Sequence, residues 1–161
     1  MFTVVHLHLL LNHLPIIVTA LALALLVVAV WRGDDTLTRT GLVFLVGAAL
    51  SALPAYLTGE GAEDAVEKLP GVTEALIERH SDIALVAAII VGALGAVALF
   101  GLWRYRRPVP VPRGFLLFVI IGSFAGSGLM AWTGLLGGEI RHTEVRPGYV
   151  PATAPGGEVE R

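Results

Sequence analysis

The sequence predicts an all-α membrane protein: four transmembrane helices in an up-down-up-down bundle, with a short amphipathic helix in the loop between the second and third. Two observations support this fold class. The 161 residues are 55% hydrophobic and 15% charged, with a mean hydropathy of +0.78, which is too apolar for a soluble domain of this length. Four uncharged segments are each long enough to cross about 30 Å of hydrocarbon, and their short connections favour antiparallel neighbours.

The predicted elements follow the chain in order. The four spans are Leu14–Trp31, Thr40–Thr58, Ile83–Trp103 and Gly114–Gly138. From Gly61 to Leu69, apolar residues recur at helical spacing with acids on the other face, so we expect the amphipathic helix there. Thr73 is a suitable N-cap for a helix that continues into the third span. We assign residues 1–145 to one transmembrane domain and residues 146–161, rich in Pro and Gly, to a flexible C-terminal tail.

The charged residues of the loops indicate how the bundle is oriented. The two loops on one side are rich in arginine: Arg32, Arg39, Arg104, Arg106, Arg107 and Arg113. The opposite side is acidic: Glu60, Glu63, Asp64, Glu67, Glu74, Glu78, Asp82, Glu139 and Glu144. The positive-inside rule places the arginine-rich loops in the cytoplasm. We therefore expect a protein of the bacterial inner membrane, surrounded by the lipid bilayer, with both termini in the periplasm.

The composition excludes several functional classes. The chain has no cysteine, which rules out disulfides, thiolate metal sites, iron–sulfur ligation and covalent attachment of a c-type haem. A net charge of −2 argues against nucleic acid as a partner. Hydrolysis is disfavoured because the sequence has no Ser/His/Asp order, phosphate-binding glycine loop or HExxH motif. Whether the chain is an enzyme is left open.

All five histidines fall on the predicted outer side. His6, His8 and His13 lie at the start of the first span, His80 precedes the third span, and His142 follows the fourth. His80 shares the apolar face of its predicted helix, so we expect it to face the bundle. A faint repeat links "AYLTGEGAEDAVE" with "AWTGLLGGEIRHTE" at the ends of the second and fourth spans. Two such hairpins would place His13 and His80 at related depths on diagonal helices.

Two opposed histidines in an apolar bundle are what axial ligation of a b-type haem requires. The first hypothesis is therefore an electron-transfer protein, similar to a cytochrome b, with one haem b near the outer face. We name His13 and His80 as its axial ligands, His142 as the substitute for either, and His8 as a further candidate. The acidic outer loop would then bind a redox partner with a basic face, in the periplasm or in the membrane.

Two alternatives stay open at this point. The first is a non-haem site for Fe, Cu or Zn, because a mixed His and carboxylate ligand set suits these ions. Its candidate ligands are His13, His80, His142, Glu63 and Glu139. Glu139 and His142 share a helical face if the fourth span continues through them. In the second alternative the chain is a structural subunit of a respiratory membrane complex. The sequence leaves homo- or hetero-oligomers open.

The stretch "HLHLLLNHLPII" resembles the N-terminal motif of a family of bacterial four-helix membrane proteins of unknown function. Members have a His, four residues, a second His, one residue and a Pro. His8, His13 and Pro15 match this spacing, and Leu9 stands where the family usually has a Pro. The segments "YLTGEGAEDAVEKLPGVTEALIERHSDIA" and "GGEIRHTE" also resemble recurring segments of such proteins. Some relatives are fused to a Rieske iron–sulfur domain, so the resemblance implies a redox setting but no catalytic residues.

Overall fold

The computed structural model describes residues 3–151, and within that range the chain is helical, without a strand. Its helices are α1 (Val4–Leu11), α2 (His13–Arg32), α3 (Asp35–Leu57), α4 (Gly59–Val66), α5 (Glu74–Arg104), α6 (Arg113–Arg141) and the 3-10 helix η1 (Thr143–Val145). Four segments are long and apolar enough to cross a membrane: residues 4–32, 35–66, 74–104 and 113–141. The predicted all-α class with four spans is therefore confirmed.

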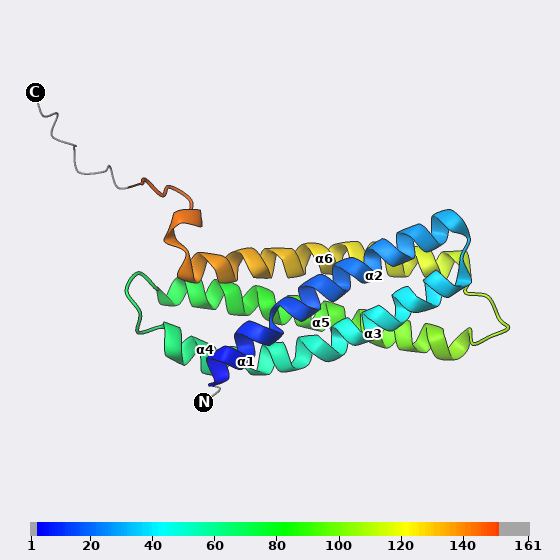
Figure 1. Cartoon of the computed structure of the whole chain (residues 1–161), viewed down its shortest axis with the longest axis horizontal. Coiled ribbons are helices and arrows are strands. Elements are labelled where there is room, and N and C mark those ends of the chain that lie inside the picture. The colour runs from blue at the N-terminus through cyan, green and yellow to red at the C-terminus, as the bar shows by residue number, and fades with distance from the viewer. Residues whose placement is uncertain (1–2, 152–161) are drawn as a thin grey trace, which may run out of the picture.

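The four long helices form an up-down-up-down bundle (Figure 1). Around the bundle, α2 packs on α3, α3 on α5, α5 on α6 and α6 on α2, so that α2 lies diagonal to α5. The loops α2–α3 and α5–α6 lie at one end, which we call the arginine end. At the opposite end, the histidine end, α1 crosses beside α4, near the start of α5 and the end of α6 (Figure 1).

The first helical segment begins earlier than predicted and is interrupted. It starts at Val4 rather than Leu14, and the break between α1 and α2 falls at Asn12. Pro15 explains this break, because proline has no backbone N–H to offer the carbonyl of Leu11, four residues before it. The interruption sets α1 apart from the straight path of α2, and α1 then packs on α4 and α3.

The predicted amphipathic helix is present, with shifted bounds. It is α4, which begins at Gly59 directly after Thr58 and ends at Val66, rather than covering 61–69. Ala62 is its buried residue, and acids occupy its exposed face. Thr73 is the N-cap residue of α5, as expected, although its side chain makes no capping hydrogen bond.

The buried core changes character along the bundle. Toward the arginine end it contains large side chains: Leu26, Leu42, Leu45, Leu116 and Val119, with Ala22 and Ala98. Toward the histidine end it is built mostly from smaller ones: Ala48, Ala52, Ala87 and Val91, with Met130. Protein interiors are close-packed wherever side chains are large enough to meet. Small side chains between four helices therefore leave space at the histidine end.

The outer surface of the bundle is apolar. Large hydrophobic side chains are exposed on all four long helices, among them Leu21, Val27, Val43, Leu50, Ile89, Leu99, Ile121, Phe124 and Leu135. Exposed aromatic side chains lie near both ends: Trp31 and Trp103 at the arginine end, Tyr56 and Trp132 at the histidine end. Aromatic residues concentrate at the two surfaces of a bilayer. This distribution is that of a membrane protein whose long helices face lipid.

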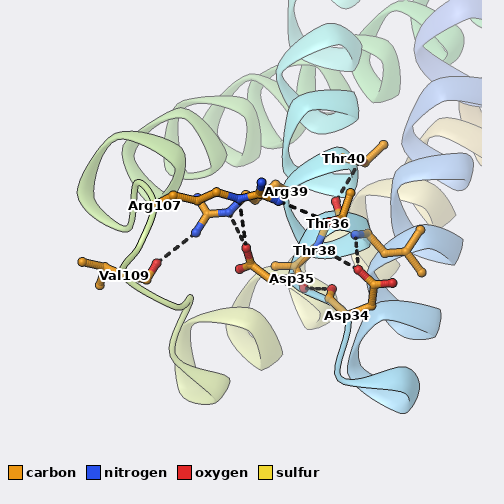
Figure 2. A network of polar contacts seen from close by, with 9 residues as sticks. Asp34, Asp35, Thr36, Thr38, Arg39, Thr40, Arg107 and Val109 are labelled. Carbon is orange, nitrogen blue, oxygen red and sulfur yellow. Dashed lines mark hydrogen bonds and ion pairs between the residues drawn. The ribbon is translucent and has the colours of Figure 1, made fainter.

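A polar network joins the two loops of the arginine end (Figure 2). The Asp35 carboxylate accepts a hydrogen bond from Arg39 Nε at 2.7 Å and lies 3.6 Å from Arg107 Nε. Arg39 in turn donates to the Val109 carbonyl at 2.9 Å, and Arg107 donates to Thr36 Oγ1 at 3.2 Å. These contacts tie the start of α3 to the α5–α6 loop and hold the two hairpins together.

The predicted C-terminal tail begins with an anchored residue. Arg146 donates to the carbonyls of Glu139 at 2.7 Å and Ile140 at 3.1 Å, in the last turn of α6. A third bond, at 2.8 Å, reaches the Gly71 carbonyl in the α4–α5 loop. Arg146 therefore fastens this loop to the end of α6 beside the histidine end. Residues 152–161 of the predicted tail lie outside the described residues.

Candidate functional site

A cavity of about 670 Å³ opens at the histidine end between α1, the start of α2, α3, α4, α5 and α6. Its volume is typical of small-molecule and cofactor sites, which span about 300–1,000 Å³. Toward the middle of the bundle the lining is apolar: Ile16, Ala52, Ala84, Ala88 and Met130. Toward the outside it is polar, and His8, His13, His80 and His142 all line it. The structure thus brings together the four histidines that the sequence singled out.

His80 is held at this cavity by a backbone carbonyl of the neighbouring helix. Its ring is partly buried, as expected, and Nδ1 lies 3.1 Å from the Thr133 carbonyl oxygen of α6. Because a carbonyl only accepts, Nδ1 carries the proton and Nε2 keeps its lone pair. Gly137 lies four residues after Thr133 on the same helical face. A Cβ there would lie 3.1 Å from His80 Cε1, so the absence of a side chain at Gly137 leaves room for the ring.

His8 repeats this arrangement in the other hairpin. Its ring, on α1, is partly buried, and Nδ1 donates to the Ala55 carbonyl at 3.0 Å, with Thr58 Oγ1 at 3.3 Å. The Ala55 carbonyl has no backbone partner within α3, which ends at Leu57, and it accepts from Thr58 Oγ1 at 3.1 Å as well as from His8. Here too a glycine, Gly59, follows four residues after the carbonyl, and a Cβ there would lie 3.7 Å from His8 Cε1.

Each hairpin therefore contains one such set of a histidine, a carbonyl and a glycine at the cavity. Both imidazoles line the same cavity. The sequence repeat has the right helices but a different register: it aligns Thr58 with Thr133, whereas the contacts make Ala55 the counterpart of Thr133. The repeat also predicts His13 as the counterpart of His80, whereas His8 is the histidine that makes the matching contact.

His13 occupies the rim of the cavity. Its side chain is exposed, and Nδ1 donates at 3.3 Å to the Leu9 carbonyl, within its own segment of chain. The break at Asn12 explains why His8, rather than His13, contacts a carbonyl of α3. Before the break, α1 crosses the end of the bundle and places His8 against α3. The geometry thus favours His8, rather than His13, as the counterpart of His80.

His142 and Glu139 do not form the shared helical face that the sequence predicts, because α6 ends at Arg141. The backbone of His142 is extended, with φ −105° and ψ 92°. Its ring Nδ1 donates to Glu144 Oε1 at 2.9 Å. The Glu144 carboxyl accepts a hydrogen bond from the backbone N–H of Glu144 and another from the His142 ring. These two bonds hold the pKa of the Glu144 carboxyl below its ordinary value. Of the two predicted glutamate ligands, Glu63 lines the cavity and Glu139 does not.

The predicted non-haem ligand set has no common centre in this structure. Within residues 3–151, no three His, Asp or Glu side chains lie close enough together to hold a metal ion. What the cavity offers is two partly buried imidazoles, each with one nitrogen bonded to a carbonyl of a neighbouring helix. That donor set fits a group which brings its remaining ligands with it, as a porphyrin brings four nitrogens.

Sequence reasoning missed Asn12, which also lines the cavity. Its amide oxygen is buried and has no hydrogen-bond partner in the described part of the chain. A buried polar atom without a partner costs about 1–3 kcal/mol, and such atoms mark places where a ligand or an ordered water belongs. The available signal was an amide side chain within an apolar stretch, between two histidines.

The chain matches a known family of proteins. The sequence profile of a family described as "Predicted membrane protein (DUF2231)" matches residues 5–144. The chain belongs to this family. The match extends over all four spans and over every residue that lines the cavity. No curated protein and no solved structure matches the chain. Membership confirms the expected membrane family of unknown function, whereas the Rieske fusion of some relatives stays a prediction.

Proposed function

We propose that this protein binds one b-type haem at the histidine end and transfers electrons, with His8 and His80 as the axial ligands. One observation carries the proposal. Two partly buried imidazoles from different hairpins line the same cavity, and each has its Nδ1 proton bonded to a backbone carbonyl of a neighbouring helix. Metal-ligating histidines have this second bond almost always, because it fixes the tautomer and the orientation of the ring and makes the other nitrogen a better donor.

The remaining residues of the cavity have identifiable tasks in this function. The haem, when bound, supplies the one-electron chemistry. Ala84, Ala88 and Met130 exclude water from the inner side, and Thr133 and Ala55 hold the two Nδ1 protons. All five histidines lie at the histidine end, on α1, at the starts of α2 and α5 and just after α6. The chain therefore provides a single redox centre near one membrane face, and electron exchange takes place at that face or with a partner subunit.

The same proposal includes an orientation and a partner. The arginine end lies in the cytoplasm of a bacterial cell, by the positive-inside rule, and the histidine end faces the periplasm. Beside the cavity, α4, the residues after it and α5 present a surface with one lysine, Lys68, and five acids: Glu63, Asp64, Glu67, Glu74 and Glu78. A redox partner with a basic face would be attracted to this surface, and the attraction would weaken as salt is raised.

The test is a spectrum of the full chain purified in detergent from cells supplied with a haem precursor. We expect a Soret band, a change on reduction, and about one haem per chain. A bound metal without porphyrin would contradict the proposal and favour the non-haem alternative. A colourless, metal-free protein from haem-replete cells would contradict both and leave the structural subunit.

Gly137→Ala tests the positioning of His80. The new Cβ would lie 3.1 Å from Cε1 and 3.4 Å from Nδ1 of His80, so the ring must move away from the Thr133 carbonyl. We expect haem affinity to fall by about tenfold, the lower range for loss of such a second bond. Thermal stability should not fall with it, because alanine favours a helix by about 1 kcal/mol over glycine. Gly128→Ala, on the same helix with open space around it, is the control. Equal haem affinity in both variants would refute the positioning role.

A further inference from the structure

Charged side chains are few around the cavity and unevenly placed. Apart from the histidines, the charged lining residues are Glu60 and Glu63 on α4 and Arg141 at the end of α6. The negative side of the mouth is therefore formed by α4 and the positive side by α6. An anionic group at the mouth would be repelled by α4 and attracted to α6.

Arg141 is available for such a group. Its side chain is exposed and makes no hydrogen bond or ion pair with any other residue in the range 3–151. Arg146, close by, differs in this respect, because its guanidinium already donates to three carbonyls. Arginine presents its donors in a planar fork that matches a carboxylate. Arg141 is thus the one arginine that lines the cavity, and its donors are unused.

We propose that Arg141 binds a carboxylate of the cavity's occupant and so sets which edge of that molecule faces outward. This inference rests on the proposed function, since a b-type haem is a planar apolar ring with two propionate groups on one edge. The propionate edge lies at the mouth against α6, away from Glu60 and Glu63. The opposite edge lies inward, among Ala84, Ala88 and Met130. Arg141 is a specificity-determining residue for a porphyrin diacid.

The experiment compares two ligands on the haem-free full chain in detergent: haem b and its dimethyl ester, which lacks the negative charges. We expect the wild type to prefer the diacid by about tenfold, as a hydrogen bond to a charged group provides. Arg141→Met should lose most of this preference by weakening diacid binding alone, and Arg141→Lys should restore part of it. Arg79→Met is the matched control, because Arg79 is exposed at the same end and does not line the cavity.

The outcomes separate this inference from the proposed function. If the wild type binds both porphyrins equally well, or if Arg141→Met weakens both to the same extent, the role of Arg141 is refuted and the haem site stands. If the wild type binds neither porphyrin, the proposed function fails and this inference fails with it. A loss of diacid preference in Arg79→Met as well would show a general charge effect and also overturn the proposal.

Discussion

Replacing His8 or His80 with alanine is expected to remove most of the haem from the purified protein, whereas His13→Ala retains it. Each of the first two changes deletes one of the two partly buried imidazoles at the cavity whose Nδ1 is bonded to a carbonyl of a neighbouring helix. We expect haem affinity to fall by more than the roughly 10–100-fold that follows loss of an outer-shell partner, because a ligand itself is lost. The measurement is the Soret absorbance per chain after purification.

Two controls keep this result from being a folding effect. Added imidazole should restore part of the haem binding of His8→Ala and His80→Ala, since it occupies the space that the side chain leaves. His13→Ala removes an exposed ring at the rim of the same cavity, so it tests whether any histidine there would serve. Unchanged haem content in His8→Ala, together with loss in His13→Ala, would reinstate the ligand pair that the sequence predicts.

Gly138→Leu is expected to abolish haem binding by occupying part of the cavity. Gly138 lines the cavity, and a Cβ at this position meets no atom within 4 Å, so the new side chain can begin there without displacing a neighbour. Stability should be preserved or raised, because leucine is a far better helix former than glycine, by up to about 1 kcal/mol. We therefore expect Gly138→Leu to lose the haem completely and to keep an intact fold.

The measurement pairs a reconstitution titration with a thermal melt of the haem-free protein in detergent. Gly128→Leu is the matched control, because Gly128 lies on the same helix, has equally open surroundings and does not line the cavity. It should bind haem like the wild type. Tight haem binding by Gly138→Leu would place the haem, or any other occupant, outside this cavity.

Most of the fold could be predicted because membrane insertion depends on features that are local in sequence. Uncharged apolar runs define the spans, and the lengths of the connections define which helices are neighbours. The errors lie at the ends of helices, where a single residue determines whether the helix continues. Thr3 caps α1 and starts the first helical segment at Val4, Pro15 interrupts that segment at Asn12, and α6 ends at Arg141, which separates Glu139 from His142.

The candidate site could be predicted in part, for a related reason. Periodicity gives the direction of a side chain relative to its own helix, and it placed His80 correctly toward the bundle. Its acceptor, the Thr133 carbonyl, could not be predicted, because backbone carbonyls have no signal in the sequence and become available only through tertiary contact. His8 was ranked below His13 because the path of α1 across the bundle depends on its packing against α3 and α4.

The central claim is that one imidazole from α1 and one from α5 bind the same haem, and electron paramagnetic resonance of the ferric protein tests it most directly. The account predicts a low-spin signal from two axial histidines in the wild type and in His13→Ala. In His8→Ala the haem that remains should give a high-spin signal. A wild-type protein without a haem signal, or a low-spin signal that persists unchanged in His8→Ala, would contradict the account.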